Sequence, residues 1–268
     1  MPDSNTPTSG QSAIRYRNAS VTYAGGVQAM KDLTLDIEDG QFVVIVGSSG
    51  AGKSTLMRSV NGLIPLTSGT VDIFGTPVPS RPGPELRRLR AGIGMIFQDF
   101  RLVKRLSVLD NVLIGRLAHV PTWRSLTGMW PKKDIEIAFD ALERVGIPDK
   151  AYVKASQLSG GQQQRVGIAR ALAQQPKVIL ADEPVASLDP ITSHQVMQDL
   201  LRINRELGIT TIVNLHFLDL AKRYGQRIIG LRHGELVYDG SGDTVTDREF
   251  LEIYGRPPEE DDFLGGAK

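Results

Sequence analysis

The stretch "VIVGSSGAGKST", residues 44–55, runs from a short apolar segment into glycines and ends on a lysine and two hydroxyl side chains. Gly47, Gly50 and Gly52 let the backbone turn sharply and approach a ligand closely, so successive N–H groups can point at phosphate oxygens. A helix beginning near Lys53 would add the positive end of its dipole to the same place. The order of strand, glycine loop and helix therefore predicts a site for phosphate groups.

Residues 47–54, GSSGAGKS, match the complete phosphate-binding loop (P-loop) pattern. Lys53 would place a point charge on the β- and γ-phosphates of a nucleotide, and the Ser54 hydroxyl would ligate Mg²⁺. A glycine-rich turn with a surface lysine would not explain why four fixed positions and both flanking elements agree. We therefore expect the chain to bind a nucleoside triphosphate. The residues expected to contact it here are Gly47, Ser48, Ser49, Gly50, Ala51, Gly52, Lys53, Ser54 and Thr55.

Composition narrows the class of protein. The chain has 268 residues, with 31 Lys and Arg against 30 Asp and Glu, so no global charge favours nucleic acid or an anionic membrane. It has no cysteine, which excludes a disulfide framework or a thiolate metal site. No apolar run approaches the roughly 20 residues that cross a bilayer, and the opening residues do not resemble a secretory signal. We expect a soluble chain that does not bind nucleic acid.

Short apolar runs alternate with helical patterns along most of the sequence, which is typical of a mainly parallel sheet covered by helices. The predicted strands are residues 41–46, 91–97, 177–181, 210–215 and 227–231, and the predicted helices include 54–63, 161–173 and 191–207.

Between residues 99 and 157 the strand patterns disappear. Residues 107–118 and 132–146 have the pattern of amphipathic helices, separated by a proline- and tryptophan-containing loop at 120–131. We interpret residues 99–157 as a helical subdomain inserted into an α/β core.

The expected organisation has four parts. They are a flexible tail at 1–13, the core at 14–98 and 158–240, the helical subdomain at 99–157, and a C-terminal helix with an acidic tail at 241–268. The polar opening residues and the acidic stretch 255–268 are expected to lack fixed structure.

A second predicted strand, "KVILADEP" at 177–184, ends in adjacent carboxylates. Because side chains alternate along a strand, Asp182 and Glu183 cannot perform the same task. Asp182 suits the surroundings of Mg²⁺, and Glu183 remains to polarise a water for attack on the γ-phosphate. An acidic pair after a strand is often only a helix cap, but the P-loop upstream favours the catalytic interpretation.

The segment "LSGGQQQRVGIARAL", residues 158–172, is a second glycine-bearing entry to a helix. In isolation it could be an ordinary capped helix start. The order of all these motifs, however, resembles the ATP-binding subunits of ABC transporters, and LSGGQ is similar to their signature sequence. The resemblance implies a P-loop NTPase (RecA-like) core with an N-terminal antiparallel β region and an inserted α-helical subdomain. It also implies that two chains sandwich ATP and Mg²⁺ between the P-loop of one and the signature of the other. The signature residues would be Ser159, Gly160, Gly161 and Gln162.

Four further residues match the family individually. Tyr23 resembles the aromatic residue that stacks on adenine, and Gln98 resembles the glutamine that reaches the metal and the attacking water. Asp189 lies in SLD, 187–189, which resembles the loop through which paired subunits contact each other. His216 follows a predicted strand at the place of the γ-phosphate switch histidine, where a neutral imidazole could bind a phosphate and the catalytic carboxylate. Alone, Tyr23 or His216 would be an ordinary structural residue.

Within the family, residues 101–117, the "TWRSL" loop, 178–190 and "GELVYDG" most resemble the ATPases of bacterial phosphonate importers. This implies an ATP-hydrolysing subunit at the cytoplasmic face of the membrane, coupled to an integral membrane permease and an extracytoplasmic phosphonate-binding protein. Phosphate, phosphite or another small solute remains an alternative cargo, and an ABC ATPase for cell division or lipoprotein release remains an alternative function. A P-loop kinase would have no use for LSGGQ.

Overall fold

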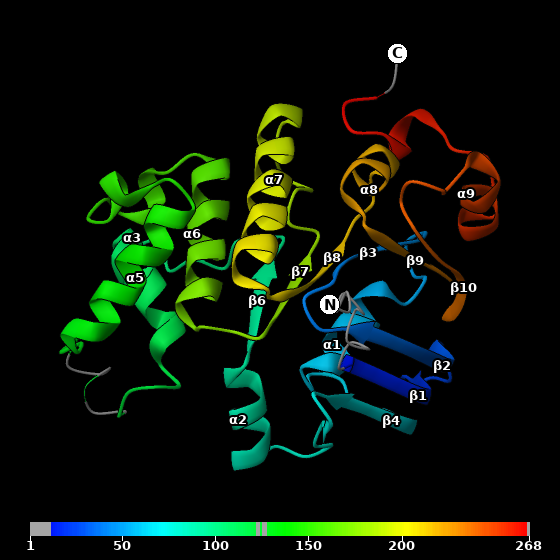
Figure 1. The fold of residues 1–268 in the computed structure, drawn as a ribbon, viewed down its shortest axis with the longest axis horizontal. Helices are drawn as coiled ribbons and strands as arrows, with labels where there is room; N and C mark the ends of the chain where they lie inside the picture. Colours follow the sequence, from blue (N-terminus) through cyan, green and yellow to red (C-terminus); the bar gives the residue numbers. More distant parts are fainter. Residues whose placement is uncertain (1–11, 122–123, 125–127, 267–268) are drawn as a thin grey trace, which may run out of the picture.

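The computed structural model describes residues 12–121, 124 and 128–266, and Figure 1 shows the fold. The predicted tail at 1–13 therefore lies almost entirely outside the described residues. The same holds for part of the predicted tryptophan loop, at 122–123 and 125–127.

The centre of the described chain is a six-stranded sheet that is parallel except for one edge strand. Its strands, in spatial order, are β10 (Glu235–Gly240), β9 (Arg227–Arg232), β3 (Phe42–Val46), β8 (Thr210–Asn214), β7 (Val178–Asp182) and β6 (Ile93–Phe97). Parallel strands end at one edge of a sheet, so the segments that follow β3, β8, β7 and β6 meet there.

Strand β3 is buried on both faces. Phe42, Val44 and Val46 pack into a core with the large helices, whereas Val43 and Ile45 pack into a second core with the N-terminal strands. This double burial explains why the sequence of β3 is a continuous apolar run rather than an alternating one.

The second core lies under an antiparallel sheet, as predicted for the N-terminal region. The sheet has the order β2 (Gln28–Glu38), β1 (Ser12–Thr22), β4 (Ser68–Ile73) and β5 (Thr76–Pro77) in the described chain. Helix α1 (Lys53–Val60) packs against it. The buried Tyr16 hydroxyl on β1 donates a hydrogen bond to Leu56 O at 2.9 Å, which fixes the helix that follows the P-loop.

The other face of the parallel sheet is covered by α6 (Gly160–Ala173), α7 (Pro190–Leu207), α8 (Leu218–Tyr224) and α9 (Asp247–Tyr254). Helix α2 (Pro84–Ala91) precedes the edge strand β6. In Figure 1, α7 lies over the end of the sheet formed by β6 and β7, with a group of helices to its left.

That group contains α3 (Val108–Leu113), η1 (Ile114–Arg116) and α5 (Lys132–Arg144), with the short turns η2 (Pro148–Lys150) and η3 (Ala155–Gln157). The described residues between 99 and 157 form no strand, as predicted. The helix predicted at 107–118 is observed as α3 followed directly by the 3₁₀ helix η1. A buried ion pair of 2.7 Å joins Arg116 to Asp134, and Arg116 also donates to Ala173 O on α6. Helix α6 therefore contacts both the parallel sheet and this group of helices.

The expectation that residues 255–268 lack fixed structure is wrong for residues 255–266. This stretch forms the turn η4 (Glu260–Asp262), in which the Arg256 guanidinium binds both carboxylate oxygens of Asp262 at 2.6 and 3.0 Å. Phe263 and Leu264 pack against the main core. Acidic composition alone was misleading, because two of the carboxylates, Glu259 and Asp262, pair with Arg256 and two apolar residues follow them.

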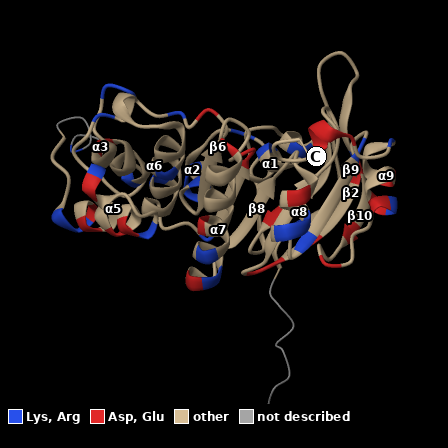
Figure 2. Ribbon diagram, turned by 90° about the horizontal axis from the view of Figure 1, so that it is seen from above, with Lys and Arg blue, Asp and Glu red and all other residues tan. Residues whose placement is uncertain are grey.

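Charged residues of both signs alternate over α5, α7 and α8 (Figure 2). Within the described residues no helix has the length and apolarity that a membrane span requires.

Candidate functional site

The P-loop connects β3 to α1 at the edge where the parallel strands end. Gly52 caps α1 with a φ of 104°, and a Cβ atom on it would lie 2.3 Å from the Ala29 carbonyl oxygen. Only glycine fits both the left-handed backbone and this close approach. The P-loop can therefore adopt this conformation because glycine, which has no Cβ atom, occupies the crowded position 52.

Lys53 is the first residue of α1 and is 5% exposed. Its Nζ donates to Gly47 O at 2.6 Å and to Ser48 O at 3.1 Å. Burial lowers the pKa of Lys53 to about 8, although Glu183 and Asp182 oppose the shift. Two neutral carbonyl groups of its own loop thus hold the Lys53 ammonium. A negatively charged phosphate group could take their place as its partner.

Asp182 at the end of β7 lies beside the loop. Its Oδ1 accepts hydrogen bonds from Ser54 Oγ at 3.2 Å and from Asn214 Nδ2 at 2.8 Å. A serine hydroxyl next to a carboxylate suits Mg²⁺, which binds few protein oxygens and completes its shell with phosphate and water. No group of three or more His, Asp and Glu in the described residues could hold a metal by itself. Ser54 and Asp182 therefore fit a metal that a nucleotide helps to bind.

Glu183 and His216 contact each other beyond the ends of β7 and β8. His216 Nε2 lies 2.6 Å from Glu183 Oε1, and the side chains are 39% and 19% exposed. The His216 hydrogen bond lowers the pKa of Glu183 despite an opposing effect of burial, and Lys53 adds to the lowering. Glu183 is therefore an ionised acceptor at neutral pH that faces the cavity.

These elements enclose a cavity of about 300 Å³. The described residues that line it are Tyr23, Val27, Ala29, Ser49, Gly50, Ala51, Gly52, Lys53, Ser54, Thr55, Glu183 and His216. Tyr23 is 41% exposed and its hydroxyl lies 3.0 Å from Thr55 Oγ1, so its ring stands at the cavity rim.

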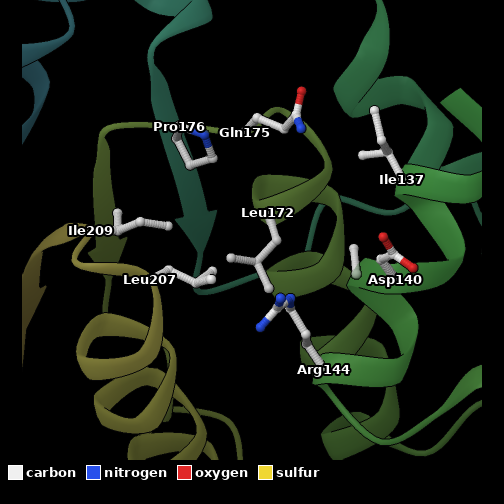
Figure 3. Close-up of a pocket in the computed structure, with 9 residues that line it drawn as sticks. Ile137, Asp140, Arg144, Leu172, Gln175, Pro176, Leu207 and Ile209 are labelled. Atoms are coloured by element: carbon white, nitrogen blue, oxygen red, sulfur yellow. The ribbon is translucent and has the colours of Figure 1, made fainter. Parts of the chain in front are cut away.

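A second cavity of about 310 Å³ lies between α5, α6 and α7 (Figure 3). Arg144, Asp140 and Leu172 line it, and none of the motif residues is among the described residues of its wall. Because the two cavities are nearly equal in size, the chemistry of the lining identifies the candidate site.

Gln98 follows β6, whose last residue Phe97 pairs with Asp182 of β7. The pairing of β6 with β7 therefore places Gln98 near Asp182 and Glu183 at the same edge of the sheet. Gln98 is not among the described residues that line the cavity. Gln98 is near the site in this conformation without forming part of its wall.

The LSGGQ residues lie at the N-terminus of α6. The Ser159 hydroxyl accepts from Gln162 N at 3.4 Å and the Gln162 side chain accepts from Ser159 N at 3.0 Å, which completes a capping box. A Cβ atom on Gly161 would lie 2.4 Å from Thr192 of α7. Among the described residues of the P-loop cavity, none comes from this segment. Within one chain, the P-loop and the LSGGQ segment therefore do not line the same cavity.

Asp189 caps α7, where its Oδ1 accepts from Thr192 N at 3.0 Å. Hydrogen bonds from Thr192 lower the pKa of Asp189. Asp189 is exposed, and Thr192, which donates to it, packs against Gly161 of α6. Asp189 does not line the P-loop cavity in the part of the chain described.

Sequence reasoning missed three residues at the site. Asn214 is fully buried and orients Asp182, and Arg58 lies 3.7 Å from the second oxygen of the same carboxylate. The polar end of the apolar run "TTIVN" could have identified Asn214.

The third is Tyr254 on α9, whose hydroxyl donates to His216 O at 3.5 Å. Burial raises the pKa of Tyr254 to about 12, against a hydrogen bond from the Gly47 backbone. No local sequence feature indicates this contact, because α9 is far from both loops along the chain.

The sequence of this chain is similar to those of ATP-binding proteins of phosphonate importers. PhnC, the phosphonates import ATP-binding protein of Shouchella clausii, is 58% identical over 252 residues, which are 94% of this chain and 95% of that protein. Its counterpart in Staphylococcus aureus is 58% identical over 254 residues, 95% of this chain and 99% of that one. The resemblance to phosphonate importer ATPases is thereby confirmed.

Solved structures confirm the predicted fold. CbiO1 of Clostridium perfringens, part of the ABC transporter complex cbiONQ, superposes with a TM-score of 0.79 at 30% identity, covering 90% of this chain and 93% of that one. A dimeric ATP-binding cassette, MJ0796 bound to ADP and Pi, has a TM-score of 0.73 at 35% identity and is covered completely by 87% of this chain. The family model described as ABC transporter matches residues 30–186, and this chain therefore belongs to the ABC transporter family.

Proposed function

We propose that this chain is the ATP-hydrolysing subunit of an ABC importer and couples ATP binding and hydrolysis to the uptake of phosphonates. The carrying observation is that the 2.6 Å contact between His216 and Glu183 lies in the wall of the same cavity as Lys53. One cavity thus holds phosphate-binding and water-activating groups. The phosphonate assignment is supported by relatives that share 58% identity over nearly their whole length.

ATP binds with its phosphates on the P-loop. The Lys53 ammonium exchanges the Gly47 and Ser48 carbonyls for β- and γ-phosphate oxygens, which compensate its burial with negative charge. The loop amides and the N-terminus of α1 contribute further donors. The adenine stacks on Tyr23 at the exposed rim of the cavity.

Ser54, Asp182 and Gln98 would hold Mg²⁺, Ser54 through its hydroxyl and the other two directly or through water. When bound, the metal would supply positive charge that stabilises the transferring phosphoryl group. Asn214 and Arg58 keep the Asp182 carboxylate in place through its two oxygens.

Glu183 accepts a proton from, or orients, the water that attacks the γ-phosphate, and His216 holds the Glu183 carboxylate and contacts the γ-phosphate. The lowered pKa of Glu183 keeps it ionised for this task. Phosphoryl transfer passes through a loose transition state, so positioning and charge stabilisation contribute most of the rate enhancement.

Two copies of the chain form the complete site. Ser159, Gly160, Gly161 and Gln162 bind the ATP held by the P-loop of the other copy, and Asp189 lies at the contact between copies. This arrangement is supported by the start of α6, where Ser159 is exposed and Gly160, Gly161 and Gln162 are half-buried, outside their own P-loop cavity. The dimeric form of MJ0796 also supports it.

The chain works at the cytoplasmic face of the membrane with a permease and, through it, an extracytoplasmic phosphonate-binding protein. Residues 14–98 and 158–240 form the ATP-binding core, and residues 99–157 form the subdomain that contacts the permease. A groove of about 350 Å³ between Asn61, Met95, Phe97, Ile114 and Arg170 offers a place for a permease segment. It adjoins Gln98, so docking there reaches the nucleotide site.

The test is uptake of labelled 2-aminoethylphosphonate and of labelled phosphate in cells that lack the native gene. Wild type is compared with Glu183→Gln and with Glu252→Gln, which makes the same change on an exposed position of α9. We expect Glu183→Gln to abolish phosphonate uptake and Glu252→Gln to retain it.

Parallel loss of phosphate uptake would extend the cargo to other oxyanions. If neither solute depends on Glu183, the phosphonate assignment is wrong. ATP hydrolysis by the purified chain would then show whether the ATPase assignment still holds.

A further inference from the structure

Helix α6 contacts the two loops of the nucleotide site from one stripe of its surface. Gln164 faces the segment that follows Glu183, and Arg170 donates to Phe100 O and Arg101 O, just after Gln98. A Cβ atom on Gly167, between them, would lie 3.8 Å from both Phe100 O and Gln164 Oε1. The spacing of three residues places these positions on one helix face.

Gln164 is completely buried in this stripe. Its Nε2 donates a 2.7 Å hydrogen bond to Pro184 O, whereas its Oε1 has no hydrogen-bond partner in the described part of the chain. The amide cannot be reversed, because two oxygens would then face each other. A buried acceptor without a partner is destabilising, and a methionine of similar size would fill the space without one. What the glutamine provides here is the donor to Pro184.

The carbonyl it binds belongs to a strained turn. Glu183 has a φ of 52°, in the left-handed region that a side chain with a Cβ disfavours, and Ala186 N closes the turn on Glu183 O at 3.3 Å. Such a conformation persists only where neighbouring contacts determine it. The Gln164 bond holds the carbonyl of Pro184, the residue after Glu183, inside the turn that Ala186 closes. It thereby helps to fix the direction in which the Glu183 carboxylate leaves the backbone.

From these contacts we infer that Gln164 is a positioning residue for Glu183, and that it holds the strained turn in which the carboxylate meets His216. This inference rests on the proposed ATPase function, because only that function gives Glu183 a task. Gln164 lies just beyond Ser159–Gln162 on the same helix, so the turn is anchored to the element that carries the signature.

The experiment uses the purified full chain with Gln164→Met and Gln164→Glu. The matched control is Gln174→Met at the end of the same helix, where the Nε2 donates to Ile93 O at 2.9 Å, away from the cavity. Steady-state ATPase gives kcat and KM, and nitrogen NMR signals of the His216 ring report on Glu183 without requiring activity. The His216 signals are assigned among the four histidines with His216→Asn.

We expect Gln164→Met to lower kcat by about 10-fold to 100-fold with an unchanged KM for ATP, because displacement of a reacting group lowers the rate without weakening phosphate binding. The same variant should shift the His216 signals, and Gln174→Met should change neither quantity. The carboxyl group introduced by Gln164→Glu can donate to Pro184 O only while protonated. Its kcat relative to wild type should therefore fall as the pH rises.

The inference is overturned if Gln164→Met leaves kcat or the His216 signals at the wild-type value, or if the relative kcat of Gln164→Glu does not depend on pH. An inactive wild type whose His216 signals still shift in Gln164→Met would refute the proposed function and retain the positioning contact.

Discussion

His216 Nε2 lies 2.6 Å from Glu183 Oε1, and the two residues follow the neighbouring strands β8 and β7. Each side chain alone is a common feature at a strand end. Their contact lies in the wall of a cavity that the P-loop also lines.

Glu183→Gln should lower kcat by roughly 10²-fold or more, because the amide keeps the shape but cannot accept the proton of water. ATP binding should remain, since Lys53 and the loop amides are intact. The ATP-bound state should then accumulate as a dimer, which gel filtration with and without Mg-ATP measures. A variant that stays monomeric with Mg-ATP would contradict the two-copy site.

ATP affinity should depend on pH through Lys53. The pKa of this lysine is lowered to about 8 by burial, so the nucleotide-free chain carries the ammonium below that pH and loses it above. Because phosphate favours the charged form, the Kd for Mg-ATP should stay constant below about pH 8 and rise as the pH increases further. Calorimetry between about pH 7 and pH 9.5 tests this.

Two variants of Lys53 serve as controls for the pH dependence of the Kd. Lys53→Ala should abolish tight ATP binding at every pH. Lys53→Arg stays charged and should show weaker binding that does not change over this range. Equal pH dependence in wild type and Lys53→Arg would assign the titration to another group.

Tyr23→Ala should weaken ATP binding by about 1–3 kcal/mol, the usual contribution of a stacked base. Tyr23→Phe retains the ring and loses only the hydroxyl contact with Thr55, so it should bind ATP nearly as well as wild type. Tripolyphosphate, which has no base, should bind all of these chains equally. If Tyr23→Ala binds ATP normally, the adenine lies elsewhere.

Arg170→Ala should lower the free energy of unfolding by about 1.5–3 kcal/mol, because a charged donor to two backbone carbonyls is lost. Phe100 and Arg101, whose carbonyls it binds, have φ values of 55° and 47°, so the turn after Gln98 depends on this support. Urea denaturation measures the change. Arg205→Ala, on an exposed position of α7, should change stability by less than about 0.5 kcal/mol.

The P-loop, the acidic pair and the LSGGQ helix start could be identified from the sequence because each depends on neighbouring residues: a glycine where a Cβ would clash, a carboxylate where a strand ends, a serine that caps a helix. The alternation of apolar runs and helical patterns likewise determined the α/β class. Local spacing also indicated the helices of residues 99–157.

Tertiary structure decided which of these residues meet. The strand order β3, β8, β7 brings Asn214 to Asp182 and His216 to Glu183, although each pair is more than 30 residues apart. The contacts of Gln164 with Pro184 and of Tyr254 with His216 depend on how α6 and α9 pack. The pairing of Arg256 with Asp262 ordered a stretch whose acidic composition had indicated disorder. Composition and periodicity record which residues are present, whereas these pairings depend on distances that exist only once the sheet and helices have assembled.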